Sequence, residues 1–478
     1  MGCLICAMLW NVLFTFAFLF PLFFLALVIR TRLRRQKDTV AFFHPYCNAG
    51  GGGERVLWCA VNAMKKEYAG RNIRFVIYTG DIDAKPQEIL SKARSRFDIS
   101  VDEQNLHFVY LRTRRWLEAN NYAHLTLALQ SLAALIVGIE ALCSVNPEVF
   151  IDTMGYPFTL PLFRWVAGSR IGCYVHYPTI SSDMIQKVES RETCYNNMEW
   201  IASSGWLSLC KLIYYRIFAQ VYRLCGKCAD VVMVNGSWTR NHILDLWRIP
   251  ERTFVVYPPC NVDTFLKLKC DAERALSEQR QVQLLSVGQI RPEKDHRLQI
   301  CALAELKKRL NADGIDCSVR LVVCGGCRHE EDHERALELQ RYAEQLGLTE
   351  KDIEWALNVP IDTLCSLMRN SLIGLHTMQN EHFGISVVEG IAAGQIMIAH
   401  NSGGPKLDIL NAITPEEEHR IGFLATSVRE YVDNVIQVLL MSAEERERIR
   451  QNGKKSIEKF SDSNFELRWN SAVAKLLR

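Results

Sequence analysis

The sequence predicts an α/β protein with two doubly wound domains behind an N-terminal transmembrane helix. Three observations predict this fold: a long uncharged segment opens the chain, β-branched runs then alternate with helical stretches, and the alternation restarts after Pro258-Pro259. Short strands that alternate with helices are typical of parallel sheets covered by helices. With 478 residues, the chain is also long for a single core.

The composition excludes several classes of protein. Hydrophobic residues make up 49% of the chain and charged residues 23%, as in ordinary globular proteins, which argues against disorder. A net charge of +3 gives no support for nucleic-acid binding. The 17 cysteines are expected to be reduced and mostly buried, because the bulk of the chain is predicted to face the cytoplasm.

The predicted anchor covers residues 1–37. From Leu4 to Ile29 there is no charged side chain, and a helix of that length reaches roughly 39 Å, enough to cross a bilayer. Basic residues follow at once, which by the positive-inside rule places the rest of the chain in the cytoplasm. A cleaved signal peptide is the alternative, but the segment lacks a charged start and a small-residue cleavage site.

The first predicted domain, residues 38–259, is a doubly wound domain of Rossmann type. Helices are expected from Glu54 and Pro86, and another that Ser237 caps. Its expected strands are 40–44, 73–80, 106–111, 148–153, 170–178 and 229–236.

The second predicted domain, residues 260–478, begins after a hinge at Pro258-Pro259, where two φ angles are fixed. Terminal helices are expected from Ser442 to Leu477. Its expected strands are 282–288, 319–326, 352–357, 371–377 and 395–404. Open parallel sheets bind ligands at the carboxyl ends of their strands, so the two domains are expected to face a shared cleft.

Two internal apolar stretches have alternative interpretations. Residues 125–145 are nearly uncharged and favour a buried helix that covers a sheet over a second membrane span. Residues 206–228 interleave basic side chains with aromatic ones, so a buried helix and a helix at a membrane surface both remain open.

Metal sites have weak support in this sequence. Cys324 and Cys327 precede two histidines, but the single residue between Cys327 and His329 is too short for a zinc finger. The sequence "DID" at 81–83 has the spelling of a metal motif but lies far from the candidate phosphate-binding residues. No metal or other cofactor is therefore expected.

The segment "HTMQNEHFGISVVEGIAAGQIMIAHNSGGP", 376–405, carries the most informative pattern. It predicts Glu381 in a loop after a strand, Phe383, Gly384 and Ile385 at a helix start, and Glu389 about one turn inside that helix. Backbone N–H groups at a helix start bind anions, and a carboxylate within the helix can accept hydrogen bonds from a ribose. Acidic residues are rare among apolar ones in a helix unless they have a partner, so Glu389 indicates a binding role.

A second element, "VGQIRPEKDH" at 287–296, places two cations after a strand and its Gly288 turn. Arg291 and Lys294 can neutralise a diphosphate and stabilise it as a leaving group. A solvated loop is the alternative interpretation. Together the two elements describe a site for a nucleotide sugar.

These motifs resemble those of the retaining GT-B glycosyltransferases of glycosyltransferase family 4. The longer stretches "FFHPYCNAGGGGERVLW", "DTMGYPFTLPLF", "YVHYPTISSDM", "VNGSWT" and "YPPCNVD" resemble a branch that acts on lipid-linked oligosaccharides. The resemblance covers essentially the whole chain. It implies a retaining α-1,2-mannosyltransferase that uses GDP-mannose to add the fourth and fifth mannoses to Man3GlcNAc2-PP-dolichol. The reaction would take place on the cytosolic face of the endoplasmic reticulum.

The resemblance also implies roles for individual residues. Arg291 and Lys294 would hold the diphosphate, Glu389 the ribose and Glu381 the transferred mannose, while residues 383–385 supply N–H groups. His176 would lie beneath the reacting sugar, although a buried core histidine is the alternative. Retention would need neither a covalent intermediate nor a metal, and neighbouring mannosyltransferases of the pathway are possible partners.

The four glycines Gly50 to Gly53 lack the Lys-Ser/Thr of a P-loop. Gly51 and Gly52 are instead expected in the first strand-to-helix loop of domain 38–259, which the resemblance makes the acceptor-side domain, close to the donor diphosphate. Two alternatives to the mannosyltransferase remain: a related GT-B enzyme that acts on another lipid-linked acceptor, for instance with UDP-N-acetylglucosamine, and a catalytically silent membrane scaffold. Intact Glu381, Glu389, Arg291 and Lys294 argue against a scaffold.

Overall fold

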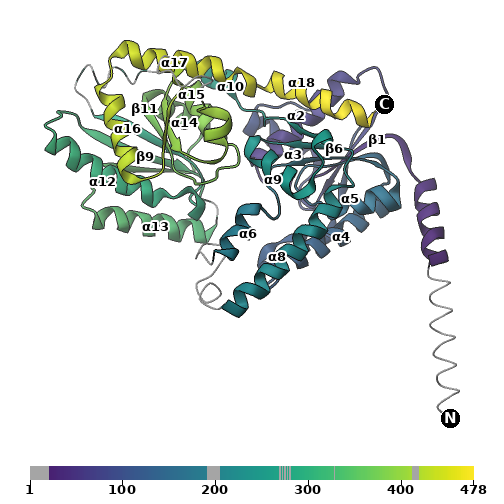
Figure 1. The fold of residues 1–478 in the computed structure, drawn as a ribbon. Coiled ribbons are helices and arrows are strands. Elements are labelled where there is room, and N and C mark those ends of the chain that lie inside the picture. The colour runs from purple at the N-terminus through teal and green to yellow at the C-terminus, as the bar shows by residue number, and fades with distance from the viewer. Residues whose placement is uncertain are drawn as a thin grey trace. The chain divides into compact units, whose positions relative to one another are not determined.

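The computed structural model describes residues 21–190, 205–268, 281–327, 329–411 and 419–477, together with residues 271, 273, 276 and 278. These residues form two compact units, each built on one parallel sheet (Figure 1). The first unit contains residues 1–234, 239–255 and 466–478, and the second contains residues 235–238 and 256–465. This grouping differs from the predicted division at the end of the chain, because the last residues belong with the first sheet.

The first unit has seven parallel strands in the order β3-β2-β1-β4-β5-β6-β7. The strands are β1 Gln36–Phe43, β2 Arg74–Thr79, β3 Leu106–Tyr110, β4 Pro147–Asp152, β5 Arg170–Val175, β6 Val231–Val234 and β7 Thr253–Val255. All six predicted strands are confirmed, and β7 was not predicted. The order reverses between β1 and β4, which is the position where doubly wound sheets bind ligands.

Helices cover both faces of this sheet. They are α2 Gly52–Glu67, α3 Pro86–Phe97, α4 Thr126–Ser144, α5 Thr159–Pro161, α6 Ser182–Glu189, α8 Gly205–Gly226 and α9 Ser237–Trp247, with the short turns η1 Arg112–Leu117, η2 Ala119–Asn121, η3 Leu162–Ala167 and η4 Pro250–Arg252. The helix starts predicted near Glu54 and at Pro86 are confirmed within two residues. At α9 the prediction needs correction: Ser237 is the first helical residue, and the Asp408 carboxylate accepts its N–H at 2.8 Å.

The second unit has six parallel strands in the order β10-β9-β8-β11-β12-β13, and the order reverses between β8 and β11. Its strands are β8 Val282–Val287, β9 Val319–Gly325, β10 Ile353–Leu357, β11 Ser371–His376, β12 Ile396–His400 and β13 Phe423–Ala425. Its helices are α10 Val262–Leu266, α12 His296–Ala312, α13 Glu330–Gln345, α14 Ile361–Asn370, α15 Ile385–Ala392, α16 Val428–Leu440 and α17 Ala443–Ile457, with turns η5 Pro292–Lys294, η6 Pro405–Ile409 and η8 Glu458–Phe460. Helix α18 Asp462–Val473 begins in this unit, but most of it and the following turn η9 Ala474–Leu476 belong to the first unit. The five predicted strands and the terminal helices are confirmed.

The membrane predictions have mixed outcomes. Residues 21–33 are helical and expose large apolar side chains, whereas residues 4–20 of the predicted anchor lie outside the described residues. Among the described helices, α4 alone is long and apolar enough to cross a membrane by length and composition, with a mean hydropathy of 1.8. The inner face of α4 nevertheless packs into the core of the first sheet through Ala133, Ala134, Val137 and Ala141. It is therefore a sheet-covering helix, as predicted, and its outer face is exposed.

Candidate active site

The carboxyl edge of the second sheet gathers the predicted donor-binding residues at its switch point. Strand β8 leads through Gly288 to Arg291 and Lys294, and the neighbouring strand β11 leads to Glu381. The Lys294 ammonium lies 2.5 Å from a carboxylate oxygen of Glu381. The two predicted elements, far apart in the sequence, therefore meet within one unit.

Glu381 is held as an ion in a buried setting. Burial alone raises the pKa of its carboxyl, but the His376 ring, 3.2 Å away, and the Lys294 ammonium together hold that pKa well below its usual range. His376 is the last residue of β11, and the sequence analysis did not single it out. Its position at the end of an apolar strand, five residues before Glu381, could have indicated its role.

A second layer of polar side chains fixes the backbone that carries Lys294. The Thr377 hydroxyl donates to the carbonyl of Lys294 at 2.7 Å, and Gln299 donates to that hydroxyl at 2.8 Å. Both Thr377 and Gln299 are buried. These buried hydrogen bonds connect the Lys294 loop to the loop after β11. They keep the backbone of Lys294, and with it the charged side chain, in one position.

Helix α15 begins beside these loops, as the sequence predicted. Gly384 is its N-cap with φ of 107°, a conformation that favours glycine, and Glu389 lies one turn inside the helix. The N–H groups of the first turn have no acceptor within the helix, so the helix start carries partial positive charge. Arg291 is exposed and forms no ion pair with any residue in the described part of the chain. Exposed Arg291 and the helix start are therefore placed to receive an anion on this edge.

The glycines of "NSGGP" allow the Glu381 loop to approach the next strand end. A Cβ on Gly403 would lie 2.2 Å from the carbonyl oxygen of Glu381, and one on Gly404 would lie 2.3 Å from that of Phe383. The Gly404 N–H donates to the Glu381 carbonyl at 2.7 Å. The backbone of Glu381 is therefore positioned by direct contact with two glycines.

The first sheet has its own polar cluster at its switch point. His44, Thr153 and His176 directly follow β1, β4 and β5. The His44 Nδ1 lies 2.8 Å from the Thr153 hydroxyl, and the His176 Nε2 lies 3.1 Å from the Thr153 carbonyl. His44 is fully buried and His176 half-buried, so His176 is the member that a ligand at this edge could contact.

The glycine-rich loop lies beside this cluster. A Cβ on Gly53 would be 3.6 Å from the His176 Nε2 and 3.8 Å from His44. Within the loop, the buried carboxylate of Glu54 accepts a hydrogen bond from the N–H of Gly51, and Gly52 begins α2. The loop is thus held by a hydrogen bond within itself. Because Gly53 has no side chain, it does not cover the His176 ring.

The candidate zinc ligands do not come together as a site. Cys324 packs into the core on one face of the second sheet, and Cys327 belongs to the core on the other face. Both thiols are buried and free. Within the described residues, no group of three or more side chains could hold a metal ion.

Buried His296 makes the second unit sensitive to acid. Burial, with Lys294 and His376 nearby, lowers the pKa of His296 to about 4. The unfolded chain binds a proton on this ring below pH 6.5 and the folded chain does not, so the free energy of unfolding falls by about 1.4 kcal/mol per pH unit between these values. We expect His296→Phe to reduce the loss of melting temperature between pH 7 and pH 5, measured in detergent. An unchanged loss in the variant would contradict this assignment.

The two sheets and the cluster around Lys294 define a glycosyltransferase of the GT-B class. Two solved structures of similar fold are sucrose-phosphate synthase from Thermosynechococcus elongatus (TM-score 0.64, 13% identity, covering 92% of this chain and 99% of that one) and HepE from Anabaena in complex with UDP and glucose (TM-score 0.58, 15% identity, covering 92% and 98%). At this level of identity the likeness concerns the fold alone. A family model described as "Glycosyl transferases group 1" matches residues 271–456.

A second family model, described as "ALG11 mannosyltransferase N-terminus", matches residues 37–247. The relatives named GDP-Man:Man(3)GlcNAc(2)-PP-Dol alpha-1,2-mannosyltransferase include those of Xenopus tropicalis (48% identity, 90% of this chain and 86% of the relative), Caenorhabditis elegans (47%, 97% and 97%) and Homo sapiens (47%, 95% and 90%). The chain belongs to this family of α-1,2-mannosyltransferases. The recognition made from the sequence motifs is confirmed.

Proposed function

We propose that this enzyme transfers mannose from GDP-mannose to Man3GlcNAc2-PP-dolichol and adds the fourth and fifth mannoses in α-1,2 linkage. Its near full-length similarity to relatives that carry this activity in their name supports the choice of substrates. The observation that carries the chemistry is the partly buried Lys294–Glu381 pair beside the start of α15. In this pair, a cation that can bind a diphosphate lies next to a carboxylate that can bind sugar hydroxyls, at one edge of the sheet.

In the proposed mechanism the second unit holds the donor. Lys294, exposed Arg291 and the N–H groups at residues 383–385 stabilise the charge that develops on the departing GDP. Glu389 accepts hydrogen bonds from the ribose, and Glu381, kept ionised by Lys294 and His376, accepts from hydroxyls of the mannose. Gly288 begins the loop that carries Arg291 and Lys294.

The acceptor hydroxyl attacks the anomeric carbon from the face that GDP leaves, so the α configuration is retained. The bond from that carbon to the β-phosphate oxygen breaks, and the phosphate takes the proton of the hydroxyl. We further propose that His176 contacts the transferred mannose during this step, while Gly51 and Gly52 hold the loop near the diphosphate. No covalent intermediate on the enzyme is required.

We also propose that the enzyme acts in the endoplasmic reticulum membrane, with a single N-terminal span and its catalytic domains in the cytoplasm. The uncharged segment Leu4–Ile29 followed by five basic residues up to Lys37 supports this orientation. The lipid-linked acceptor named for the relatives is consistent with a membrane location. Other mannosyltransferases of the same pathway are candidate partners.

Product analysis with defined acceptors tests the proposed reaction. Purified enzyme is incubated with the Man3GlcNAc2-diphosphate lipid and either radiolabelled GDP-mannose or radiolabelled UDP-N-acetylglucosamine. We expect transfer from GDP-mannose alone, with two additions that an α-1,2-specific mannosidase removes. Transfer from the UDP-sugar alone would contradict the donor, and a single addition would contradict the proposed count. Wild-type turnover in His176→Asn would contradict its role.

A further inference from the structure

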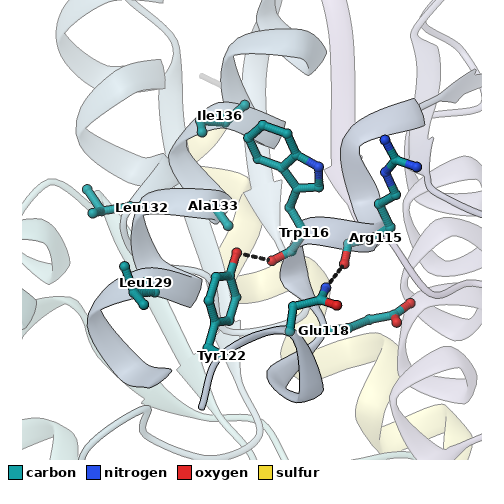
Figure 2. Close-up of a pocket in the computed structure, with 9 residues that line it drawn as sticks. Arg115, Trp116, Glu118, Tyr122, Leu129, Leu132, Ala133 and Ile136 are labelled. Carbon is teal, nitrogen blue, oxygen red and sulfur yellow. Dashed lines mark hydrogen bonds between the residues drawn. The ribbon is translucent and has the colours of Figure 1, made fainter. Parts of the chain in front are cut away.

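The first unit contains an apolar groove that the proposed reaction does not use. It lies between α4 and the turns η1 and η2, with a cavity volume of about 560 Å³. Figure 2 shows Leu129, Leu132 and Ile136 along α4, with Trp116 and Tyr122 on the loop beside them. Arg115 and Glu118 supply polar groups from the same loop.

In the loop that forms one wall of the groove, side chains satisfy the hydrogen-bonding capacity of backbone carbonyls. The carbonyls of Arg115, Trp116 and Leu117 each accept a hydrogen bond from a side chain. The donors are the Asn121 amide at 2.6 Å, the Tyr122 hydroxyl at 2.7 Å and the Gln130 amide at 2.8 Å. A surface that binds hydrocarbon needs satisfied backbone carbonyls, because a carbonyl without a hydrogen bond loses free energy when hydrocarbon displaces water from it.

The single charge on α4 is used to attach the same loop. The Glu140 carboxylate accepts from the N–H of Arg112 at 2.8 Å and from the N–H and hydroxyl of Thr113. The other residues of the helix carry no charge. Glu140 therefore fixes η1 against α4, and the outer face of the helix remains apolar.

That outer face is a continuous apolar stripe at helical spacing. Leu125, Leu129, Leu132, Ile136 and Ile139 are between 37% and 58% exposed. Three of the five, Leu129, Leu132 and Ile136, also line the groove. An exposed stripe of this kind on a helix whose other face is in the core marks an interaction surface.

The membrane-proximal end of the chain is attached to the same part of the unit. The Arg32 guanidinium donates to the carbonyl of Trp165 at 2.6 Å, and the Asn146 amide donates to the carbonyl of Thr31 at 2.8 Å. Trp165 belongs to η3, whose Leu162 lies against Gly138 of α4. The element that leads to the uncharged N-terminal segment is therefore connected through η3 to α4, the helix that carries the apolar stripe.

We propose that this groove binds the polyisoprenyl chain of the lipid-linked acceptor, an inference that rests on the proposed function. The chain lies on Leu129, Leu132 and Ile136 and is covered by the Trp116 indole, a residue type enriched where hydrocarbon meets water. The exposed Arg115 at the rim offers a cation to the diphosphate. Glu118 on the same rim has the Arg114 guanidinium 3.9 Å away, which moderates its repulsion of that anion.

A pair of matched variants separates the groove from a general lipid-facing surface. Leu132→Asp and Ile139→Asp both place a carboxylate on an exposed position of the α4 stripe, but Leu132 alone lines the groove. KM is measured for an acceptor with a full polyisoprenyl chain and for one with a short alkyl chain. We expect Leu132→Asp to raise KM at least tenfold for the long-chain acceptor only, and Ile139→Asp to leave both values near wild type.

Direct labelling reports on the groove without relying on catalysis. A polyprenyl phosphate that carries a photoreactive diazirine is irradiated with the full chain in detergent, and labelled peptides are mapped. We expect labelling of α4 in wild type and in Ile139→Asp, reduced labelling in Leu132→Asp, and competition by unlabelled polyprenyl phosphate but not by phosphatidylcholine.

Three outcomes would overturn the proposal: equal effects of the two substitutions, equal competition by phosphatidylcholine, and labelling that Leu132→Asp leaves unchanged. The first two would make the groove part of a general bilayer contact. If wild type bound the polyprenyl probe at α4 but transferred no mannose, the proposed function would fail while the chain-binding site remained.

Discussion

Replacing Lys294 by alanine is expected to lower kcat for mannosyl transfer by about 10²–10³-fold, the usual effect of removing one group that stabilises developing charge. The substitution removes a cation from the diphosphate and leaves the partly buried Glu381 carboxylate without its lysine partner. Turnover is measured with saturating GDP-mannose and lipid acceptor. Membrane association, measured by flotation, should remain at the wild-type level.

Lys307 provides a matched control for this substitution. It lies 2.5 Å from Asp352, the same distance as in the Lys294–Glu381 pair, but on α12, away from the strand edge that carries Glu381. Lys307→Ala is expected to lower stability slightly and to leave kcat within about twofold of wild type. Equal kcat values in the two variants would show that Lys294 does not contribute to the active site.

Replacing Gly403 by alanine is expected to lower kcat/KM for GDP-mannose by about 10²-fold, because small displacements of catalytic groups have effects of this size. Gly403 has φ of 59°, and its new Cβ would collide with the backbone of Glu381. Relief of that collision moves Glu381 away from Lys294 and stretches the hydrogen bond from Gly404. Steady-state kinetics and the melting temperature are measured on the same preparation.

Gly347→Ala is the control for backbone strain alone. Gly347 has φ of 78°, and nothing lies within 4 Å of the position that its Cβ would occupy. This variant should lose about 1–2 kcal/mol of stability, the usual penalty of a left-handed conformation, and keep its activity. If both variants lost the same stability and both stayed active, the close approach of Glu381 would not be the reason that glycine is needed at position 403.

The sequence predicted the strands well because each is a compact apolar run that ends in glycine or in a polar residue. It missed β7, Thr253–Val255, and β13, Phe423–Ala425, because three residues are too few to show a period. The position of α15 was predictable because the apolar run "ISVVEGIAAG", which contains Glu389, directly follows Gly384. The resulting placement of Glu381 near Lys294 followed from the parallel order of neighbouring strands.

The supporting residues could not be predicted in the same way. His44, Thr153 and His176 are separated by more than a hundred positions at the extremes, and their proximity depends on strand order β1-β4-β5. Ser237 was predicted to cap α9, but the acceptor for its N–H comes from Asp408, which lies in the second half of the chain. Contacts of this kind depend on tertiary structure, which local propensity does not encode.

The packing of Trp469 and Leu476 into the first unit imposes an order on folding during synthesis. Trp469 is fully buried against Phe42 of β1, and Leu476 fills the space left by the missing side chain of Gly172 on β5. The first sheet therefore keeps an uncovered apolar face until Trp469 and Leu476 have been translated and have left the ribosome. A premature stop codon shortly before Trp469 would leave the second unit's sheet complete, yet the nascent protein would expose that face to chaperones and to degradation.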